Sequence, residues 1–314
     1  MSKLAGYSVD KTITEWDEYK FSLPELYREL AKEELREDDT SRKQGLAEMR
    51  QWIVNNPYIR KVRTDAKFLL RFLRLAKFSV PMACEALERY LMMREMYPVW
   101  FKNIDSHFSL MKQMYDQGSA SILGQDSHGR TVVLFRMAFF DATICKPPQG
   151  GQFVALLIES LLELEEVQIG GIQLMIDYSD FDMQIVEQWS SADLHTSFRS
   201  FTGSYPLRYN DTHAARLPKK ALPFTEKLLS FVNPKVRERI NCYATVAELE
   251  KHFDPALRPT GYGGDLDLDA INRKWWAFIE QHREVLTAAD QMEIDLDHYA
   301  PIWDEQNAAV PTQV

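Results

Sequence analysis

The chain has 314 residues, of which 45% are hydrophobic and 26% are charged, and its formal net charge is −9. A chain of this length can bury a sizeable core in one large domain or two ordinary ones. The acidic balance argues against nucleic acid as a partner, and no run of about 18 uncharged apolar residues predicts a transmembrane helix. Residues 1–20 also lack the apolar run of a secretory signal.

Charge is unevenly distributed along this acidic chain. Residues 58–77 hold seven basic residues against one acidic residue, and residues 207–239 hold eight against three. Residues 265–305 are the reverse, with eleven acidic residues against three basic ones. The two basic segments either contact an anionic surface or form solvated helix faces, and the charge pattern leaves both interpretations open.

The first hundred residues are predicted to be helical after a loose segment at 1–20. Helix-spaced apolar residues follow Leu23-Pro24-Glu25, with Ser22 in position to cap the helix. Asn-Asn-Pro at residues 55–57 is a stop signal, and Pro81 suits the first turn of a helix. The expected helices are one from about residue 23, then 39–55, 64–75 and 80–96.

Strands and helices are predicted to alternate after residue 100, which indicates an α/β layer with some parallel strands. Asp126 to Gly129 has the residues of a hairpin turn, and the continuous apolar run 172–176 suits a strand covered on both faces. The expected strands are 119–123, 131–137, 172–176, 212–217 and 241–245. The expected helices are 153–167, a stretch through 189–201, 218–231 and 234–240. Residues 101–280 therefore form the main domain, and 281–314 form an acidic C-terminal tail.

Motifs for catalysis and for metal or cofactor binding are not found. The sequence has no G-x-S-x-G, no G-x-x-x-x-G-K-[ST] and no H-E-x-x-H. Cys84, Cys145 and Cys242 lie far apart without CxxC spacing, which predicts reduced thiols in a cytoplasmic protein. Asp177 ends a buried strand, but capping of the next segment is favoured over catalysis because no base or nucleophile accompanies it. The prediction is a protein without enzymatic activity, cofactor or metal.

Six short segments occur in an order that resembles the CRAL-TRIO family. Residues 65–78 (DAKFLLRFLRLAKF) are similar to its N-terminal helical signature, and 171–177 to its central strand. The other four are the D-x-x-G-R hairpin at 126–130, the Y-P-x-R turn at 205–208, the segment 234–240 and the closing Y-G-G at 261–264. The resemblance covers about residues 20–280, nearest the α-tocopherol transfer and cellular retinaldehyde-binding branch. It implies a helical N-terminal lobe and a mixed, largely parallel sheet, flanked by helices, that enclose a lipid pocket.

The resemblance also implies which residues line that pocket. Apolar side chains recur at i, i+3 and i+4 along residues 153–164, and others lie on the strand and helices that follow. By composition alone an ordinary packed core is the alternative. Ser160 and Tyr178 are candidates to orient a cargo hydroxyl or carbonyl. The predicted lining residues are Phe153, Leu156, Leu157, Ser160, Leu161, Leu174, Ile176, Phe181, Phe198, Phe201, Leu222 and Leu228.

A mobile amphipathic gate and a basic cleft are the remaining implications. The gate spans about residues 218–231 (PKKALPFTEKLLSF), and its composition suits a helix that rests on a membrane interface. Pro223 inside it predicts a kink or a late start. Asn210 and Ala76 stand where the family has arginines, so phosphoinositide gating is an open question. The predicted phosphoinositide and membrane contacts are Arg208, Lys219, Lys220, Lys227, Lys235 and Arg239.

The expected function is therefore the intracellular binding and transfer of a small hydrophobic ligand, such as a retinoid, a tocopherol or a related isoprenoid. The protein would be cytoplasmic, with transient contact to anionic membranes. Two alternatives remain within the resemblance: a phosphatidylinositol-type phospholipid exchange protein, and a lipid-sensing adaptor that binds protein partners through its acidic tail. The sequence does not name the cargo, because shape differences of one methylene alter preference by only about 1–3 kcal/mol.

Overall fold

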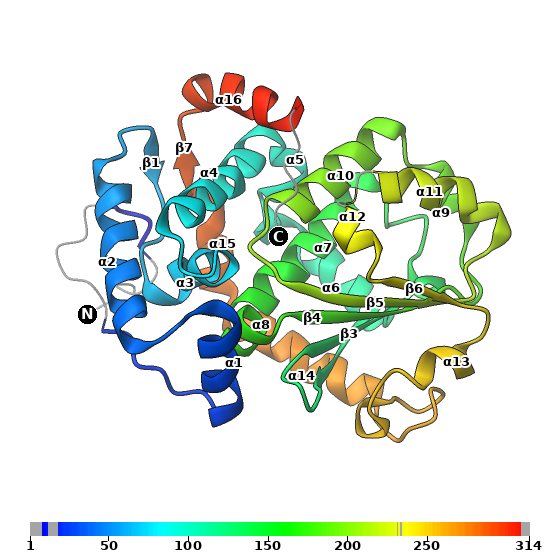
Figure 1. The fold of residues 1–314 in the computed structure, drawn as a ribbon. Helices are drawn as coiled ribbons and strands as arrows, with labels where there is room; N and C mark the ends of the chain where they lie inside the picture. Colours follow the sequence, from blue (N-terminus) through cyan, green and yellow to red (C-terminus); the bar gives the residue numbers. More distant parts are fainter. Residues whose placement is uncertain (1–7, 12–17, 231, 233, 309–314) are drawn as a thin grey trace.

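The computed structural model describes residues 8–11, 18–230, 232 and 234–308 of the chain. The N-terminal lobe is built from helices that lie beside the sheet (Figure 1). They are α1 (Glu25–Leu35), α2 (Asp39–Asn55), α3 (Ala66–Leu75), α4 (Val80–Met96), α5 (Pro98–Phe101), η2 (Ile104–His107) and α6 (Phe108–Asp116). A short strand, β1 (Ile59–Lys61), interrupts this otherwise helical lobe.

Local capping explains where these helices begin. Asp38 accepts a hydrogen bond from the Ser41 amide at 2.7 Å and Ser41 caps in return, so α2 starts at the predicted residue. The carboxylate of Asp65 accepts from the Phe68 amide at 3.0 Å and fixes the start of α3. The predicted cap at Ser22 is wrong, because Pro24 precedes α1 and no side chain caps that helix.

A five-stranded sheet forms the centre of the second lobe, in the order β2-β3-β4-β5-β6. β2 and β3 are antiparallel across the predicted hairpin, and β3 to β6 are parallel to one another. The predicted α/β fold with a mixed, largely parallel sheet is confirmed. The strands are β2 (Ala120–Gln125), β3 (Thr131–Arg136), β4 (Ile172–Asp177), β5 (Tyr209–Ala215) and β6 (Ile240–Tyr243).

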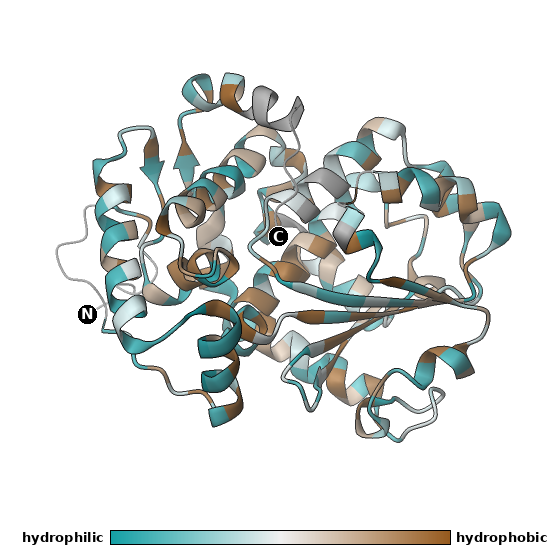
Figure 2. Cartoon of the chain, viewed as in Figure 1, coloured by the Kyte–Doolittle hydropathy of each residue, from teal (hydrophilic) through white to brown (hydrophobic). Residues whose placement is uncertain are grey.

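Helices cover both faces of this sheet (Figure 1). One group lies on what we call the inner face: η3 (Met137–Phe139), α7 (Pro147–Leu162), α8 (Glu165–Gly170), α9 (Met183–Glu187), α10 (Ser191–Gly203), η4 (Lys219–Ala221), α11 (Leu222–Ser230) and α12 (Pro234–Arg237). The other group lies on the outer face: α13 (Val246–Glu250), η5 (Pro255–Leu257) and α14 (Leu268–Gln281). Strands β3 and β4 are largely hydrophobic, whereas α1 and α2 are largely hydrophilic (Figure 2).

Several predicted elements differ from the observed ones in their bounds, and for two of them the reason lies outside their own sequences. The helix predicted at 153–167 is divided into α7 and α8, and Glu163 and Leu164 lie between them. Glu163 is held there by Arg63 and Arg71 of the N-terminal lobe. The strand predicted at 212–217 begins instead at Tyr209 and ends at Ala215, and it lies in the interior of the sheet because β6 pairs with it.

A β-bulge sets the direction of the side chains at the start of β5. In the pairing of β4 with β5, Leu174 is opposite Thr212 and Ile172 is opposite Tyr209. The two pairs are two residues apart in β4 but three residues apart in β5. β5 therefore contains one extra residue, and the usual alternation of faces is reversed at its beginning. Tyr209 consequently lies on the inner face with Ile172 and Leu174, while His213 and Ala215 lie on the outer face.

The chain returns to the N-terminal lobe after α14. The returning elements are α15 (Arg283–Ala288), η6 (Ala289–Gln291), β7 (Glu293–Ile294) and α16 (Leu296–Ala308). β7 pairs with β1 in an antiparallel two-stranded sheet, and α16 packs beside α4 (Figure 1). The described part of the acidic segment is thus folded against the first lobe.

Candidate functional site

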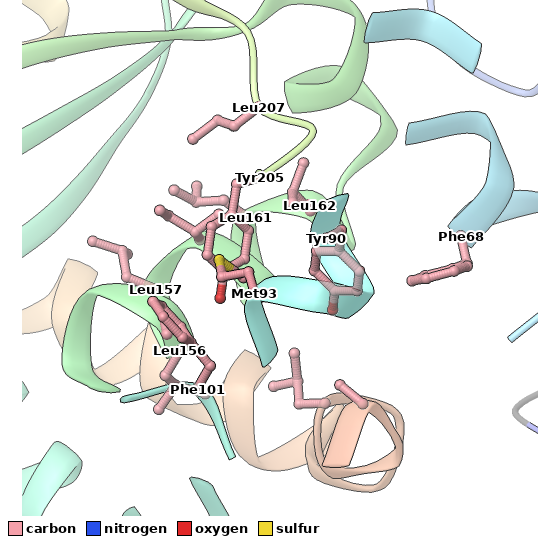
Figure 3. Close-up of a cluster of buried hydrophobic side chains, with 14 of the residues drawn as sticks. Phe68, Tyr90, Met93, Phe101, Leu156, Leu157, Leu161, Leu162, Tyr205 and Leu207 are labelled. Carbon is pink, nitrogen blue, oxygen red and sulfur yellow. The ribbon is translucent and has the colours of Figure 1, made fainter. Parts of the chain in front are cut away.

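The predicted lining residues of α7 are fully buried. Phe153, Leu156, Leu157 and Leu161 are all 2% exposed or less and belong to one hydrophobic cluster that the two lobes share. Figure 3 shows Leu156, Leu157 and Leu161 facing side chains of the N-terminal lobe. The Ser160 hydroxyl donates to the carbonyl of Leu157 at 2.8 Å. This stripe therefore packs as core, and its hydroxyl is already occupied.

The inner face of the central strand is different. Leu174 and Ile176 keep accessible surface although β4 has a strand on each side, and Tyr178 continues the same alternation just beyond the strand. Burial, with a smaller contribution from Cys242, raises the pKa of Tyr178 to about 12. Leu174, Ile176 and Tyr178 lie deep in the molecule and still keep accessible surface. This indicates that the helices over the inner face do not fill the space there completely.

Other predicted lining residues surround this face. Phe181, from the loop after β4, is partly exposed and meets Tyr178 edge-to-face with ring centroids 5.6 Å apart. Phe201 of α10 is also partly exposed and stacks on Tyr205. The side chain of Phe198 lies outside the described part of the structure. These four partly exposed members of the predicted set lie on β4, on the loop after it and on α10.

Helix α11, the predicted gate, is loosely packed. It begins at Leu222 after the single turn η4, which matches the late start predicted from Pro223. None of its described residues is buried, although four of the nine are large and apolar. Leu222 is 44% exposed, and Leu228 is partly exposed. Phe231, the last residue of the predicted gate, lies outside the described residues.

The predicted basic contacts separate into two groups at opposite ends of β5. Lys219, Lys220 and Lys227 are exposed on η4 and α11, which follow the end of the strand. Arg208 and Arg239 lie at its beginning, where Arg239 donates to the Tyr209 carbonyl at 3.1 Å. The side chain of Lys235 is not among those that the structure describes.

The arginine group is already engaged by the protein. Arg208 donates to Glu34 of α1 at 2.6 Å and to the carbonyl of Ile169. Asn210, which replaces a family arginine, donates to the Gly170 carbonyl at 2.8 Å. An anion at this end of the sheet would have to compete with Glu34 for Arg208. The lysines on α11 and η4 are more accessible than Arg208, which is partly buried.

Three arginines of the first basic segment do not lie on the surface. Arg63, Arg71 and Arg74 are at most 2% exposed and pair with carboxylates instead of facing solvent. Their partners are Asp65, Glu159, Glu163, Glu37 and Glu165. Most of these glutamates belong to α7 and the start of α8 or lie beside them. The segment therefore joins the two lobes, and the interpretation as an anion-binding surface is wrong for these three residues.

Asp177 has the capping role that the sequence favours. One carboxylate oxygen accepts from the amide of Ser179 at 2.8 Å and from its hydroxyl, and the other accepts from the Tyr262 hydroxyl at 2.8 Å. The aspartate thereby ties the Y-G-G loop to the end of β4.

Two open hollows lie on the N-terminal side of the molecule, away from β4 and α11. One, of about 520 Å³, is lined by charged residues of β1, α4 and residues 290–297. The other, of about 380 Å³, is lined by Trp52, Tyr58 and residues of α16. Neither contains a predicted site residue. Within the described residues, no helix is both long and apolar enough to cross a membrane.

Comparisons with known proteins agree with this architecture. Residues 115–264 match the CRAL/TRIO domain family, and residues 38–108 match the Pinta-like UBA domain family. Clavesin-1 of Xenopus laevis is 28% identical over 235 residues, which cover 74% of this chain and 71% of that protein. Human clavesin-2 is 26% identical over 240 residues, which cover 76% of this chain and 73% of that protein.

Among solved structures, the crystal structure of Sfh5 covers 85% of this chain and 99% of its own, with a TM-score of 0.46 and 13% identity. That likeness is too distant to bear on function. The domain match spans the whole sheet and the helices on its inner face, in the order that the sequence motifs predict. The predicted resemblance to the CRAL-TRIO family is therefore confirmed over residues 115–264, which match its domain.

Proposed function

We propose that the protein carries one small hydrophobic molecule, a retinoid, a tocopherol or a related isoprenoid, between the inner face of the sheet and helices α10 and α11. The observation that carries this proposal is the accessible surface of Leu174 and Ile176 in the centre of a five-stranded sheet. Central strands of such sheets are normally covered on both faces. A cargo lying over these residues would complete the layer.

Binding in this space is driven by removal of apolar surface from water. Each square ångström of cargo surface that becomes buried contributes roughly 25 cal/mol, so an isoprenoid chain gains several kilocalories per mole. The partly exposed rings of Phe181 and Phe201 would bury their own remaining surface at the same time. The carrier performs no chemistry on the molecule and needs no cofactor.

Helix α11 is the proposed gate. A helix without a buried residue has little packing energy to lose when it moves, and segments of this kind are drawn from the low-stability end of a protein. Its exposed Leu222 and its lysines suit an interfacial helix on an anionic bilayer. We expect a cytoplasmic protein that contacts membranes transiently, with Lys219 and Lys220 next to the head groups. Phosphoinositides are candidate head groups, and Arg208 and Arg239 are candidate contacts for such a head group at the other end of β5.

Extraction of the purified protein into organic solvent, followed by mass spectrometry, tests the proposal. An isoprenoid in stoichiometric amount is the expected result. A phospholipid would instead assign the protein to phosphatidylinositol-type exchange. If no lipid is recovered and none of the added isoprenoids binds, the carrier function is wrong, and a role as a lipid-sensing adaptor becomes the better interpretation.

A further inference from the structure

The β-bulge turns the side chain of Tyr209 to the inner face of the sheet, where the regular alternation of β5 would not place it. Without the extra residue Tyr209 would face α13, together with His213 and Ala215. With it, Tyr209 lies on the inner face and packs against the hydrophobic cluster shared by the two lobes. Bulges commonly re-aim a side chain beside a binding site.

Tyr209 is deep but partly accessible, and its hydroxyl makes no hydrogen bond within the part of the chain that the structure describes. Burial raises its pKa far above the ordinary tyrosine range, yet the side chain keeps accessible surface. Neither a hydrogen-bond donor nor an acceptor meets its hydroxyl among the described residues. A polar group in this position is expected to have a partner, because a buried hydroxyl without a hydrogen bond is destabilising.

A second unpaired hydroxyl lies close by. Tyr205 is 4% exposed, and its hydroxyl has no hydrogen-bond partner among the described residues. Its ring is held by Phe201, with centroids 5.7 Å apart and planes at 14°, and by Tyr90, with centroids 5.8 Å apart. Burial raises the pKa of Tyr205, and the neighbouring Glu159, Tyr90 and Tyr209 raise it further. Tyr205 is thus fixed in orientation with its polar atom unused.

Charges near the two tyrosines are balanced. Glu159 accepts hydrogen bonds from Tyr90 at 2.6 Å and from Arg71 at 3.1 Å, and it pairs with Arg94 at 3.5 Å. Arg94 also donates to Asp290 at 2.9 Å. An additional charged group here would be desolvated without a counter-ion, which is costly. The site is therefore suited to an uncharged oxygen.

We infer that the Tyr209 hydroxyl, supported by the Tyr205 hydroxyl, binds an uncharged oxygen of the cargo, either a hydroxyl or a carbonyl group. This inference rests on the proposed carrier function. The apolar part of the cargo extends from this point along Leu174 and Ile176 toward Tyr178 at the far end of β4. The occupied hydroxyl of Ser160 takes no part. The two tyrosines thus select lipid alcohols, aldehydes or ketones over hydrocarbons and over ionised fatty acids.

Three C20 probes with the same branched carbon skeleton test this selectivity: the allylic alcohol phytol, the saturated hydrocarbon phytane and the saturated phytanic acid. Each is titrated against the full-length protein loaded with the uncharged fluorophore diphenylhexatriene, and displacement gives its affinity. The wild type should bind phytol at least about fivefold more tightly than phytane, as expected for one hydrogen bond. It should also favour phytol over phytanic acid at pH 7.

Tyr209→Phe should abolish the preference for phytol and leave phytane affinity unchanged. Tyr205→Phe should reduce the preference.

Tyr243→Phe is the matched control. The Tyr243 hydroxyl bonds to Nδ1 of His213 at 2.8 Å on the outer face, so its removal should not alter the ratio of phytol to phytane affinity. If Tyr209→Phe lowers the affinities for phytol and phytane equally, the Tyr209 ring contributes packing only, and the inference is overturned. A loss of selectivity in Tyr178→Phe alone would also overturn the inference, because it would place the polar end of the cargo at the opposite end of β4. If neither probe displaces the fluorophore, the carrier function itself fails.

Discussion

At the scale of single residues, the buried ion pairs between α3 and α7 make the stability of the protein depend on pH. Burial alone would raise the pKa of Glu163, but Arg71 and Arg63 outweigh it and lower that pKa to about 2. Because the folded-state pKa lies below the unfolded value, the stabilisation from this carboxylate is complete above pH of about 4.5. It is lost progressively as the pH falls toward 2.

Glu163→Gln should therefore be strongly destabilising at pH 7. The amide leaves two buried guanidinium groups without full compensation, which typically costs about 3–5 kcal/mol. The variant should also show a shallower loss of stability between pH 4.5 and pH 3 than the wild type. Urea unfolding across this pH range measures both effects. Glu48→Gln on the exposed side of α2 is the control, and a similar cost for the two variants would contradict a structural role of the buried pairs.

The same residues show why sequence alone misjudged the first basic segment. Arg63, Arg71 and Arg74 are spaced as on a basic helix, and nothing local distinguishes a solvated arginine from a buried one. The glutamate partners of Arg71 and Arg63, in α7 and directly after it, lie 88 to 100 residues later in the chain. Only the packing of the two lobes brings these arginines and glutamates together. Counting charges within a short stretch of sequence therefore could not reveal the pairs.

At the scale of elements, α11 should be the part of the inner layer that meets membranes. Lys219→Glu with Lys220→Glu reverses two exposed charges at the start of the gate. Each basic residue near an anionic surface is worth about 1 kcal/mol, so binding to phosphatidylserine vesicles should fall by at least tenfold at low salt. Vesicle flotation measures the change, and cargo affinity should stay the same because neither lysine faces β4.

The matched control reverses two exposed lysines elsewhere, Lys32 of α1 and Lys43 of α2. Lys32→Glu with Lys43→Glu changes the net charge of the protein by the same amount. If both double variants lose vesicle binding equally, the attraction is a property of overall charge, and α11 is not the docking element. Raising the salt concentration should weaken wild-type binding as well, since exposed charges are screened.

Element boundaries were predictable where the signal is local. Helices α2 and α4 have the predicted bounds because Asp38, Pro57 and Pro81 act within a turn of the helix ends. The start of β5 was missed because its bulge arises from pairing with β4, which no local signal in residues 209–212 announces. The candidate polar residue Tyr209 was missed with it, since the predicted strand began three residues later.

At the scale of the whole molecule, the family resemblance predicted the order of elements and the two-lobe organisation, whereas the described path of the C-terminal segment was not foreseen. Composition indicated only an acidic tail. In the structure, Ile294 of β7 pairs with Ile59 of β1, and Tyr299 donates to Glu88 of α4 at 2.5 Å. These contacts join residues more than 200 positions apart in the chain, so they depend on the finished fold rather than on any local pattern.

This return of the chain makes the C-terminal segment part of the stability of the N-terminal lobe. Ile294 is 3% exposed and contributes to the core of that lobe, so Ile294→Ala should cost about 2–5 kcal/mol. The corresponding fall in the thermal midpoint is about 5–15 °C for a chain of this size. Amide hydrogen exchange should accelerate in β1 and α4 as well as in β7, because pairing across the two strands is weakened. Ile302→Ala, at a position 38% exposed on α16, should have little effect on either measurement. If exchange rises only within residues 293–308 while β1 and α4 stay protected, the segment is an appendage, and the first lobe is stable without it.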